Sequence, residues 1–117
     1  MTKRKEKDTP STQDSLRVFK ASVFQALAHP TRVHIMELLK ESEYTVSELL
    51  DRLGIEQSNA SQHLTVLRNR NLVTARKEGN QIHYSLRDPL LGRVLDSLKG
   101  FFQAHLEESM QVLRDLK

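Results

Sequence analysis

The sequence predicts a mainly α-helical single domain that carries one β-hairpin, and three observations support this fold class. The chain has 117 residues, about the size of one domain. Its apolar residues recur with the helical period of about 3.6, except between Val73 and Leu86, where they alternate with period two. Hydrophobic residues make up 38% of the chain, which is enough for one modest core.

The composition also narrows the function. The chain contains no cysteine, which excludes a disulfide framework, a thiolate metal site and a thiol redox switch. No apolar run approaches the roughly 18 residues of a membrane helix, and the charged N-terminus lacks the apolar stretch of a secretory signal. We therefore expect a cytoplasmic protein with no membrane partner. Residues 1–10 are charged and end at Pro10, which predicts a disordered basic tail ahead of a domain at residues 11–117.

Four helical segments precede the hairpin. The first covers residues 11–28 and has one apolar stripe. Pro30 ends it and suits the first turn of the second helix, at residues 31–40, which is apolar over most of its girth and is therefore expected to be buried. A capping box at Thr45-Val-Ser-Glu48 starts a short third helix. The fourth helix runs from about residue 57 to about residue 70.

The third and fourth helices are joined by a short turn that contains Gly54, which is the layout of a helix-turn-helix. The fourth helix has a single narrow apolar stripe, at Ala60, Leu64 and Leu67. Its opposite face carries short uncharged side chains and no carboxylate, and such side chains can donate and accept hydrogen bonds at base edges. They are Ser58, Asn59, Ser61, Gln62 and Thr65, with Arg68 and Arg70 beside them to reach phosphates.

The period-two segment predicts a β-hairpin with its turn at Glu78-Gly79-Asn80. A helix-turn-helix followed by a basic hairpin is a winged helix, in which the hairpin, or wing, lies against the sugar-phosphate backbone. The apolar residues of the hairpin are Val73, Ala75, Ile82, Tyr84 and Leu86, and its projecting polar residues are Arg76, Lys77, Gln81 and His83.

The positive charge of the chain is concentrated in this part. Residues 58–87 carry five basic residues and one acidic residue, a net charge of +4, whereas residues 1–57 are neutral overall and residues 88–117 have a net charge of −1. A local basic surface on a neutral body is what phosphate binding requires. From charge alone, a solvated face that is merely basic stays an equal alternative.

A long helix at about residues 89–117 ends the chain. Its near-heptad apolar seam consists of Leu91, Leu95, Leu98, Phe102, His105, Met110 and Leu113. A core this small cannot cover both this helix and the first one. We therefore expect a second copy of the chain to cover the apolar residues that remain exposed on these two helices. The residues predicted to form that dimer are Leu16, Phe19, Val23, Leu91, Leu95, Leu98 and Phe102.

These motifs together resemble the ArsR-type family of bacterial repressors, over about residues 19–86. The resemblance is carried by Ala26-Leu-Ala-His-Pro-Thr-Arg32, Val46-Ser-Glu-Leu-Leu50, Gln57-Ser-Asn-Ala-Ser-Gln-His-Leu64, Leu67-Arg68, Leu72-Val73 and Gly79 through Tyr84. It implies a winged helix-turn-helix of five helices, with the hairpin between the fourth and fifth. It also implies a homodimer through the first and last helices that represses from a palindromic DNA operator and leaves it when an effector binds.

By position, the resemblance implies two sets of DNA-binding residues. The groove-facing set is Gln57, Ser58, Asn59, Ser61 and Gln62, and the set that holds the DNA backbone is Arg68, Arg76 and Lys77. Family members often have Ser or Thr where this chain has Glu56. Glu56 suits the helix dipole but adds a negative charge near the DNA, which we interpret as a tuning of affinity or specificity.

The sequence leaves the effector open. The cysteine metal box of the family corresponds here to Thr45-Val-Ser-Glu48, so that metal site is absent. A second family metal site is at best half present, as His105 and Glu108, because Gly92 and Val94 occupy the other ligand positions; packing is the favoured role of His105. We predict no cofactor. An apolar molecule could bind beside Phe101, Phe102 and Met110, although such aromatic residues more often form core.

The other histidines are expected to be structural or exposed. His29, in the family motif, is predicted to make local hydrogen bonds at a helix junction, and His63 to contact structure or a phosphate rather than a metal. His34 and His83 are expected to be exposed.

Two other classes of function fit the sequence less well. An enzyme would need a nucleophile with a base, paired carboxylates or a complete metal site, and the sequence shows none. A winged-helix module for protein–protein interaction, without specific DNA binding, is the main alternative. It should carry acidic or apolar residues on the fourth helix, which the Ser/Asn/Gln face argues against.

Overall fold

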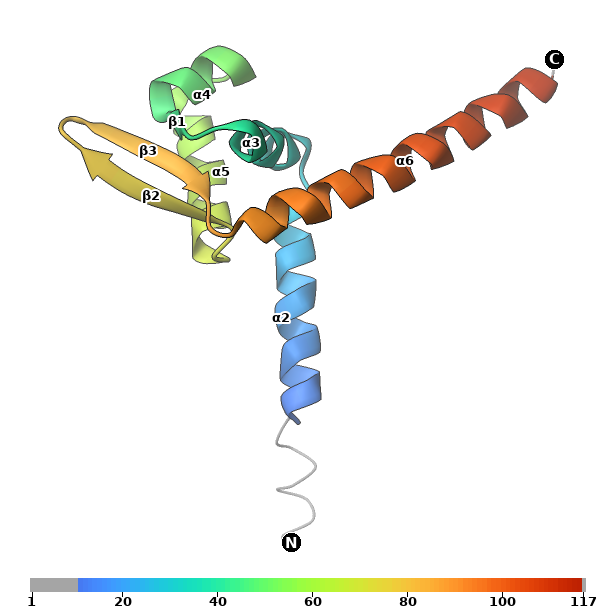
Figure 1. The fold of residues 1–117 in the computed structure, drawn as a ribbon, viewed down its shortest axis with the longest axis horizontal. Helices are drawn as coiled ribbons and strands as arrows, with labels where there is room; N and C mark the ends of the chain where they lie inside the picture. Colours follow the sequence, from blue (N-terminus) through green and yellow to red (C-terminus); the bar gives the residue numbers. More distant parts are fainter. Residues whose placement is uncertain (1–10, 117) are drawn as a thin grey trace, which may run out of the picture.

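The computed structural model describes residues 11–116, which form five helices and one three-stranded antiparallel sheet (Figure 1). The predicted mainly helical fold with a hairpin before the long last helix is confirmed, and the predicted tail at residues 1–10 lies outside the described residues. In chain order the elements are α2 (Thr12–Leu27), α3 (Pro30–Glu41), β1 (Tyr44–Thr45), α4 (Val46–Leu53), α5 (Gln57–Asn69), β2 (Val73–Glu78), β3 (Gln81–Leu86) and α6 (Pro89–Asp115).

The ends of the helices follow local sequence signals. The capping box of α4 is confirmed: the Thr45 side chain accepts from the Glu48 N–H at 3.2 Å, and the Glu48 carboxylate accepts from the Thr45 N–H at 2.9 Å. The hydrogen bond from the Thr45 backbone, and then that with its side chain, lowers the pKa of Glu48. Gly54 ends α4 in the left-handed conformation, at φ 65°. Pro30 and Pro89 lie in the first turns of α3 and α6.

The sheet has the strand order β1-β3-β2, so the short β1 adds a third strand to the predicted hairpin. Tyr44 and Thr45 pair with Tyr84 and His83. The sequence did not predict β1, because a two-residue strand shows no period. The wing itself closes through a two-residue turn, Gly79-Asn80, so Glu78 belongs to β2 rather than to the turn as predicted.

The core lies where α3, α4, α5 and the start of β2 meet, and the C-terminal end of α2 adds one residue to it. Its side chains are at most 4% exposed, and they include the whole predicted stripe of α5. The buried residues are Ala26, Ile35, Met36, Leu39, Leu49, Ala60, Leu64, Leu67, Leu72 and Val73.

Two helices extend away from this core. In Figure 1, α2 runs down and α6 runs to the upper right, and only one end of each lies against the rest of the fold. The radius of gyration is 18.9 Å, against about 13 Å for a compact chain of this length. Within the described residues, no helix has the length and apolar character that a bilayer-spanning segment needs. The protomer therefore leaves much of α2 and α6 uncovered.

Candidate nucleic-acid interface

Helix α5 separates a buried apolar face from an exposed polar one. Ala60, Leu64 and Leu67 are at most 1% exposed, which fixes the rotation of the helix about its axis. The structure places all the predicted groove-facing residues on the exposed face: Gln57, Ser58, Asn59, Ser61 and Gln62. Thr65 also lies there, but its hydroxyl already donates to the Ser61 carbonyl at 2.8 Å.

The first turn of α5 carries no side-chain cap. Glu56 occupies the N-cap position, and its carboxylate makes no capping hydrogen bond. Its backbone carbonyl accepts from the Ala60 N–H at 3.0 Å, as a normal first helical bond. The departure from the family pattern at Glu56 therefore has a structural consequence, because a Ser or Thr there would cap the helix and Glu56 does not.

A histidine pair holds α5 against the start of α3. His29 is the N-cap of α3, and its Nδ1 accepts from the Thr31 N–H at 3.1 Å, as predicted for a helix junction. Its ring centroid lies 4.3 Å from that of His63 on α5. Burial, followed by electrostatic interaction with His29 and with Arg32, lowers the pKa of His63. His63 therefore packs against the start of α3.

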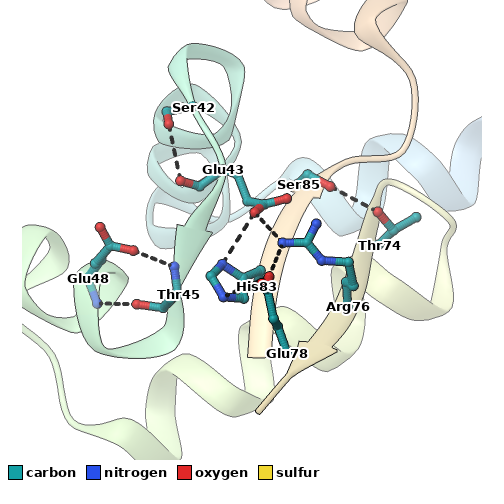
Figure 2. A network of polar contacts seen from close by, with 9 residues as sticks. All are labelled: Ser42, Glu43, Thr45, Glu48, Thr74, Arg76, Glu78, His83 and Ser85. Carbon is teal, nitrogen blue, oxygen red and sulfur yellow. Dashed lines mark hydrogen bonds and ion pairs between the residues drawn. The ribbon is translucent and has the colours of Figure 1, made fainter. Parts of the chain in front are cut away.

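The wing carries the predicted basic residues, but one of them is already paired. Arg76 and Lys77 are both exposed. Figure 2 shows the Arg76 guanidinium between two carboxylates: its Nη2 lies 2.9 Å from Glu43 Oε1 and 2.9 Å from Glu78 Oε2. Arg68, the third predicted backbone contact, is exposed in the last turn of α5.

His83 belongs to the same group, and the expectation that it is exposed is wrong. Its side chain is 22% exposed, and its Nδ1 lies 3.3 Å from Glu43 Oε1 (Figure 2). The reason is β1: pairing of Thr45 with His83 brings Glu43 over the imidazole. His34, in contrast, is exposed as expected.

The residues predicted to form the dimer divide into two groups. Leu16, Phe19 and Phe102 are exposed, at 48%, 52% and 59%. The others are half-buried on their own protomer: Val23, Leu91, Leu95 and Leu98. An open apolar hollow of about 490 Å³ lies along α2, α3 and α6, where Phe24, Leu27, Val33, Leu95, Leu98 and Phe102 form most of its wall.

The candidate metal ligands lie on the exposed part of α6. The His105 ring stacks on that of Phe101, with centroids 6.4 Å apart and planes 3° from parallel. Within residues 11–116, no group of three His, Cys, Asp or Glu side chains is placed to hold a metal ion. Among these described residues, His105 and Glu108 have no third ligand beside them.

Comparison with known proteins agrees with this architecture. Residues 29–75 match the family described as bacterial regulatory protein, arsR family. The HTH-type transcriptional regulator Rv0081 of Mycobacterium tuberculosis is 40% identical over 105 residues, which covers 89% of this chain and 92% of that protein. The biofilm growth-associated repressor of Agrobacterium fabrum is 37% identical over 84 residues, 72% of each chain.

Solved structures give the same result. The crystal structure of Rv0081 superposes with a TM-score of 0.76 at 40% identity and covers 81% of this chain and 96% of that one. The homodimeric winged helix-turn-helix DNA-binding domain of Mb0332 from Mycobacterium bovis, solved by NMR, has a TM-score of 0.79 at 28% identity, covering 86% of this chain and 93% of that one. None of these relatives supports a pure protein-interaction module. The chain belongs to the arsR family of bacterial regulatory proteins and is a winged helix-turn-helix, DNA-binding transcriptional regulator.

Proposed function

We propose that this regulator acts in the cytoplasm as a homodimeric repressor that binds a two-fold-symmetric operator with one α5 helix per half-site. The observation that carries the proposal is the exposed face of α5, which is polar and free of carboxylates from Gln57 to Asn69, with Arg68 in the last turn as its one charged side chain. The residues assigned to base edges are Gln57, Ser58, Asn59, Ser61 and Gln62, and those assigned to phosphates are Arg68, Arg76 and Lys77.

The packing of α5 supports this assignment. Because three apolar residues of one stripe are buried, the helix cannot rotate to hide its polar face. A helix in the major groove needs side chains that can both donate and accept, and Gln62 and Asn59 provide both groups. The basic residues lie at the C-terminal end of α5 and on the wing, which is where a duplex lying on α5 presents its phosphates.

The exposed apolar residues of α2 and α6 support the homodimer. Leu16, Phe19 and Phe102 are about half exposed or more, and such residues gathered on projecting helices mark a protein contact. A second copy is the simplest occupant, since a two-fold axis lets the same surface meet itself. Two α5 helices related by that axis would read half-sites about one helical turn apart, roughly 34–36 Å.

The proposal is tested by fluorescence anisotropy with two labelled duplexes, one from the DNA upstream of its own gene and one with the same bases scrambled. Wild-type protein should prefer the upstream duplex. Gln62→Ala should weaken upstream binding by about tenfold or more and scrambled binding little, because a base contact is lost. Lys77→Ala should weaken both alike and flatten the salt dependence, because a phosphate contact is lost. Equal losses on both duplexes for Gln62→Ala would contradict the base-reading role of α5.

Release from DNA is tested with the same upstream duplex. The family resemblance implies an effector, and the titration is repeated in chelator and then with added zinc or nickel. Loss of binding with metal that is restored by His105→Ala would make His105 a metal ligand, and Glu108→Gln would then test the second candidate. No change with metal would direct the search to small organic effectors.

A further inference from the structure

Four titratable side chains form a compact charged cluster on the outer face of the wing. Glu43 comes from the residue before β1, Arg76 and Glu78 from β2, and His83 from β3. In Figure 2 the carboxylates of Glu43 and Glu78 lie above and below the Arg76 guanidinium, with the His83 imidazole to its left. When His83 is neutral, the cluster holds one positive and two negative charges. The surface around Arg76, where the wing should bind phosphate, therefore has no net positive charge.

The neighbouring residue shows that this pairing is specific to one face of the sheet. Successive residues of a strand point to opposite faces, so Lys77 points away from the cluster. Among the residues that the structure describes, Lys77 forms no ion pair, whereas Arg76 is bound to two carboxylates at 2.9 Å each. The two basic residues of the wing thus differ in how much of their charge is available to DNA.

We infer that Glu43 weakens the binding of the wing to DNA, because it competes with the phosphate backbone for the Arg76 guanidinium. This inference rests on the DNA-binding function proposed above and concerns the strength of one contact within it. A phosphate that approaches Arg76 must either displace a carboxylate or lie beside it. Both cost free energy, the first through a lost charge-assisted hydrogen bond and the second through like-charge repulsion.

Glu43 is the more effective of the two competitors. Its side chain is 38% exposed, against 68% for Glu78, and the same oxygen contacts both Arg76 and His83. Glu78 lies next to the turn, and only its longer contact, 3.9 Å to His83, adds to its bond with Arg76. Glu43 is also anchored from outside the hairpin, because β1 pairs with β3. A phosphate can therefore push Glu78 aside more easily than Glu43.

The consequence for recognition is a lower sequence-independent affinity. Phosphate contacts raise binding to every DNA sequence, whereas base contacts discriminate between sequences. A wing whose arginine is held by carboxylates adds less to binding of arbitrary DNA. It leaves a larger share of the binding free energy to the base-reading face of α5.

The test is Glu43→Gln, which keeps the shape of the side chain and removes its charge. The probe is a labelled duplex of about 30 base pairs with scrambled sequence, because phosphate contacts do not depend on sequence. We expect affinity to rise about threefold to tenfold at about 50 mM salt, and the slope of log affinity against log salt to steepen by up to about 0.9. The upstream duplex should gain by the same factor.

Two further variants separate competition from a general charge effect. Glu41→Gln makes the same charge change two residues away, at a carboxylate that contacts Lys40 rather than the wing, and should raise affinity less than about twofold. In an Arg76→Ala background, Glu43→Gln should raise the affinity for DNA by no larger a factor than Glu41→Gln does. Thermal unfolding of each variant checks that the fold is retained.

Several outcomes would overturn the inference. If Glu43→Gln binds DNA like the wild type or like Glu41→Gln, Glu43 does not compete for Arg76. If it binds more weakly while still folded, Glu43 orients Arg76 toward DNA instead. If its gain persists without Arg76, the effect is one of net charge only. Wild-type protein that binds neither duplex would refute the proposed function itself, and this inference with it.

Discussion

The helices α5 and α6 are both amphipathic, but they expose opposite faces. In α5, of 13 residues, the apolar stripe is buried and the polar face is exposed. In α6, of 27 residues, only Gly92 is fully buried, and Phe101, Leu106 and Leu113 are at least 60% exposed. An exposed polar, uncharged helix face suits a nucleic acid, and an exposed apolar one suits another protein surface. The kind of surface that a helix leaves uncovered thus indicates the chemistry of its partner.

The two ends of α6 differ in how closely they pack against the rest of the protomer. Near its start, Gly92 lets the helix approach α3, because a Cβ at this position would lie 3.0 Å from Lys40 Cγ. Lys40 Nζ also pairs with Asp96 Oδ1 at 2.7 Å, and this hydrogen bond raises the pKa of Lys40. From Phe101 to Met110, nearly every side chain is exposed. The first part of α6 therefore packs within its own protomer, and the rest of the helix is available to a partner.

The largest effect should come from a change on the buried side of α5. Leu64→Ala should lower the free energy of unfolding by about 2–5 kcal/mol, because it opens a cavity in a core where Leu64 is 1% exposed. Leu116→Ala, at the 76% exposed end of α6, should change it by less than about 0.5 kcal/mol. Both are measured by denaturant unfolding at one fixed protein concentration. Similar losses for the two variants would mean that the end of α6 is as firmly packed as α5.

A change on the exposed face of α6 should disrupt association instead. Phe102→Asp places a charge in the proposed dimer contact and should weaken self-association by about 30-fold or more, since buried aromatic residues often dominate interfaces. Helix content should stay unchanged, because Phe102 is 59% exposed on its own protomer. The control is Ser97→Asp, which adds the same charge to the same helix about 140° away. Sedimentation velocity distinguishes monomer from dimer, and an intact Phe102→Asp dimer would place the contact elsewhere.

The smallest effect should be a loss of stability in acid at the junction of α3 and α5. The pKa of His63 is lowered, chiefly by burial, so the folded state favours the neutral ring. Its stabilising contribution is complete above the ordinary histidine pKa of 6.5 and decreases as the pH falls below it. We expect His63→Gln to reduce the loss of unfolding free energy between about pH 7.5 and pH 5.5. An unchanged pH dependence would assign the acid sensitivity to other groups.

Local patterns in the sequence were sufficient for the order of elements and for the orientation of α5. The stripe at Ala60, Leu64 and Leu67 determines which face of the helix is buried, because three apolar residues at helical spacing can share only one side. The capping box at Thr45 and Glu48 determines where α4 starts, because both partners lie within four residues of one another. Such interactions span one helical turn, and they can therefore be read directly from neighbouring residues.

Tertiary structure alone decided that Glu43 joins the charged cluster of the wing. Arg76 and His83 are basic groups in the sequence, but β1 brings Glu43, 33 residues before Arg76, to within 2.9 Å of its guanidinium. Periodicity carries no information about such a contact, because a two-residue strand leaves no pattern and charges far apart in sequence meet only after the sheet has formed. The sequence therefore determined which residues the wing offers. The fold determined that Glu43 reaches one of its two basic side chains, Arg76, because the pairing of β1 with β3 brings residues far apart in the sequence into contact.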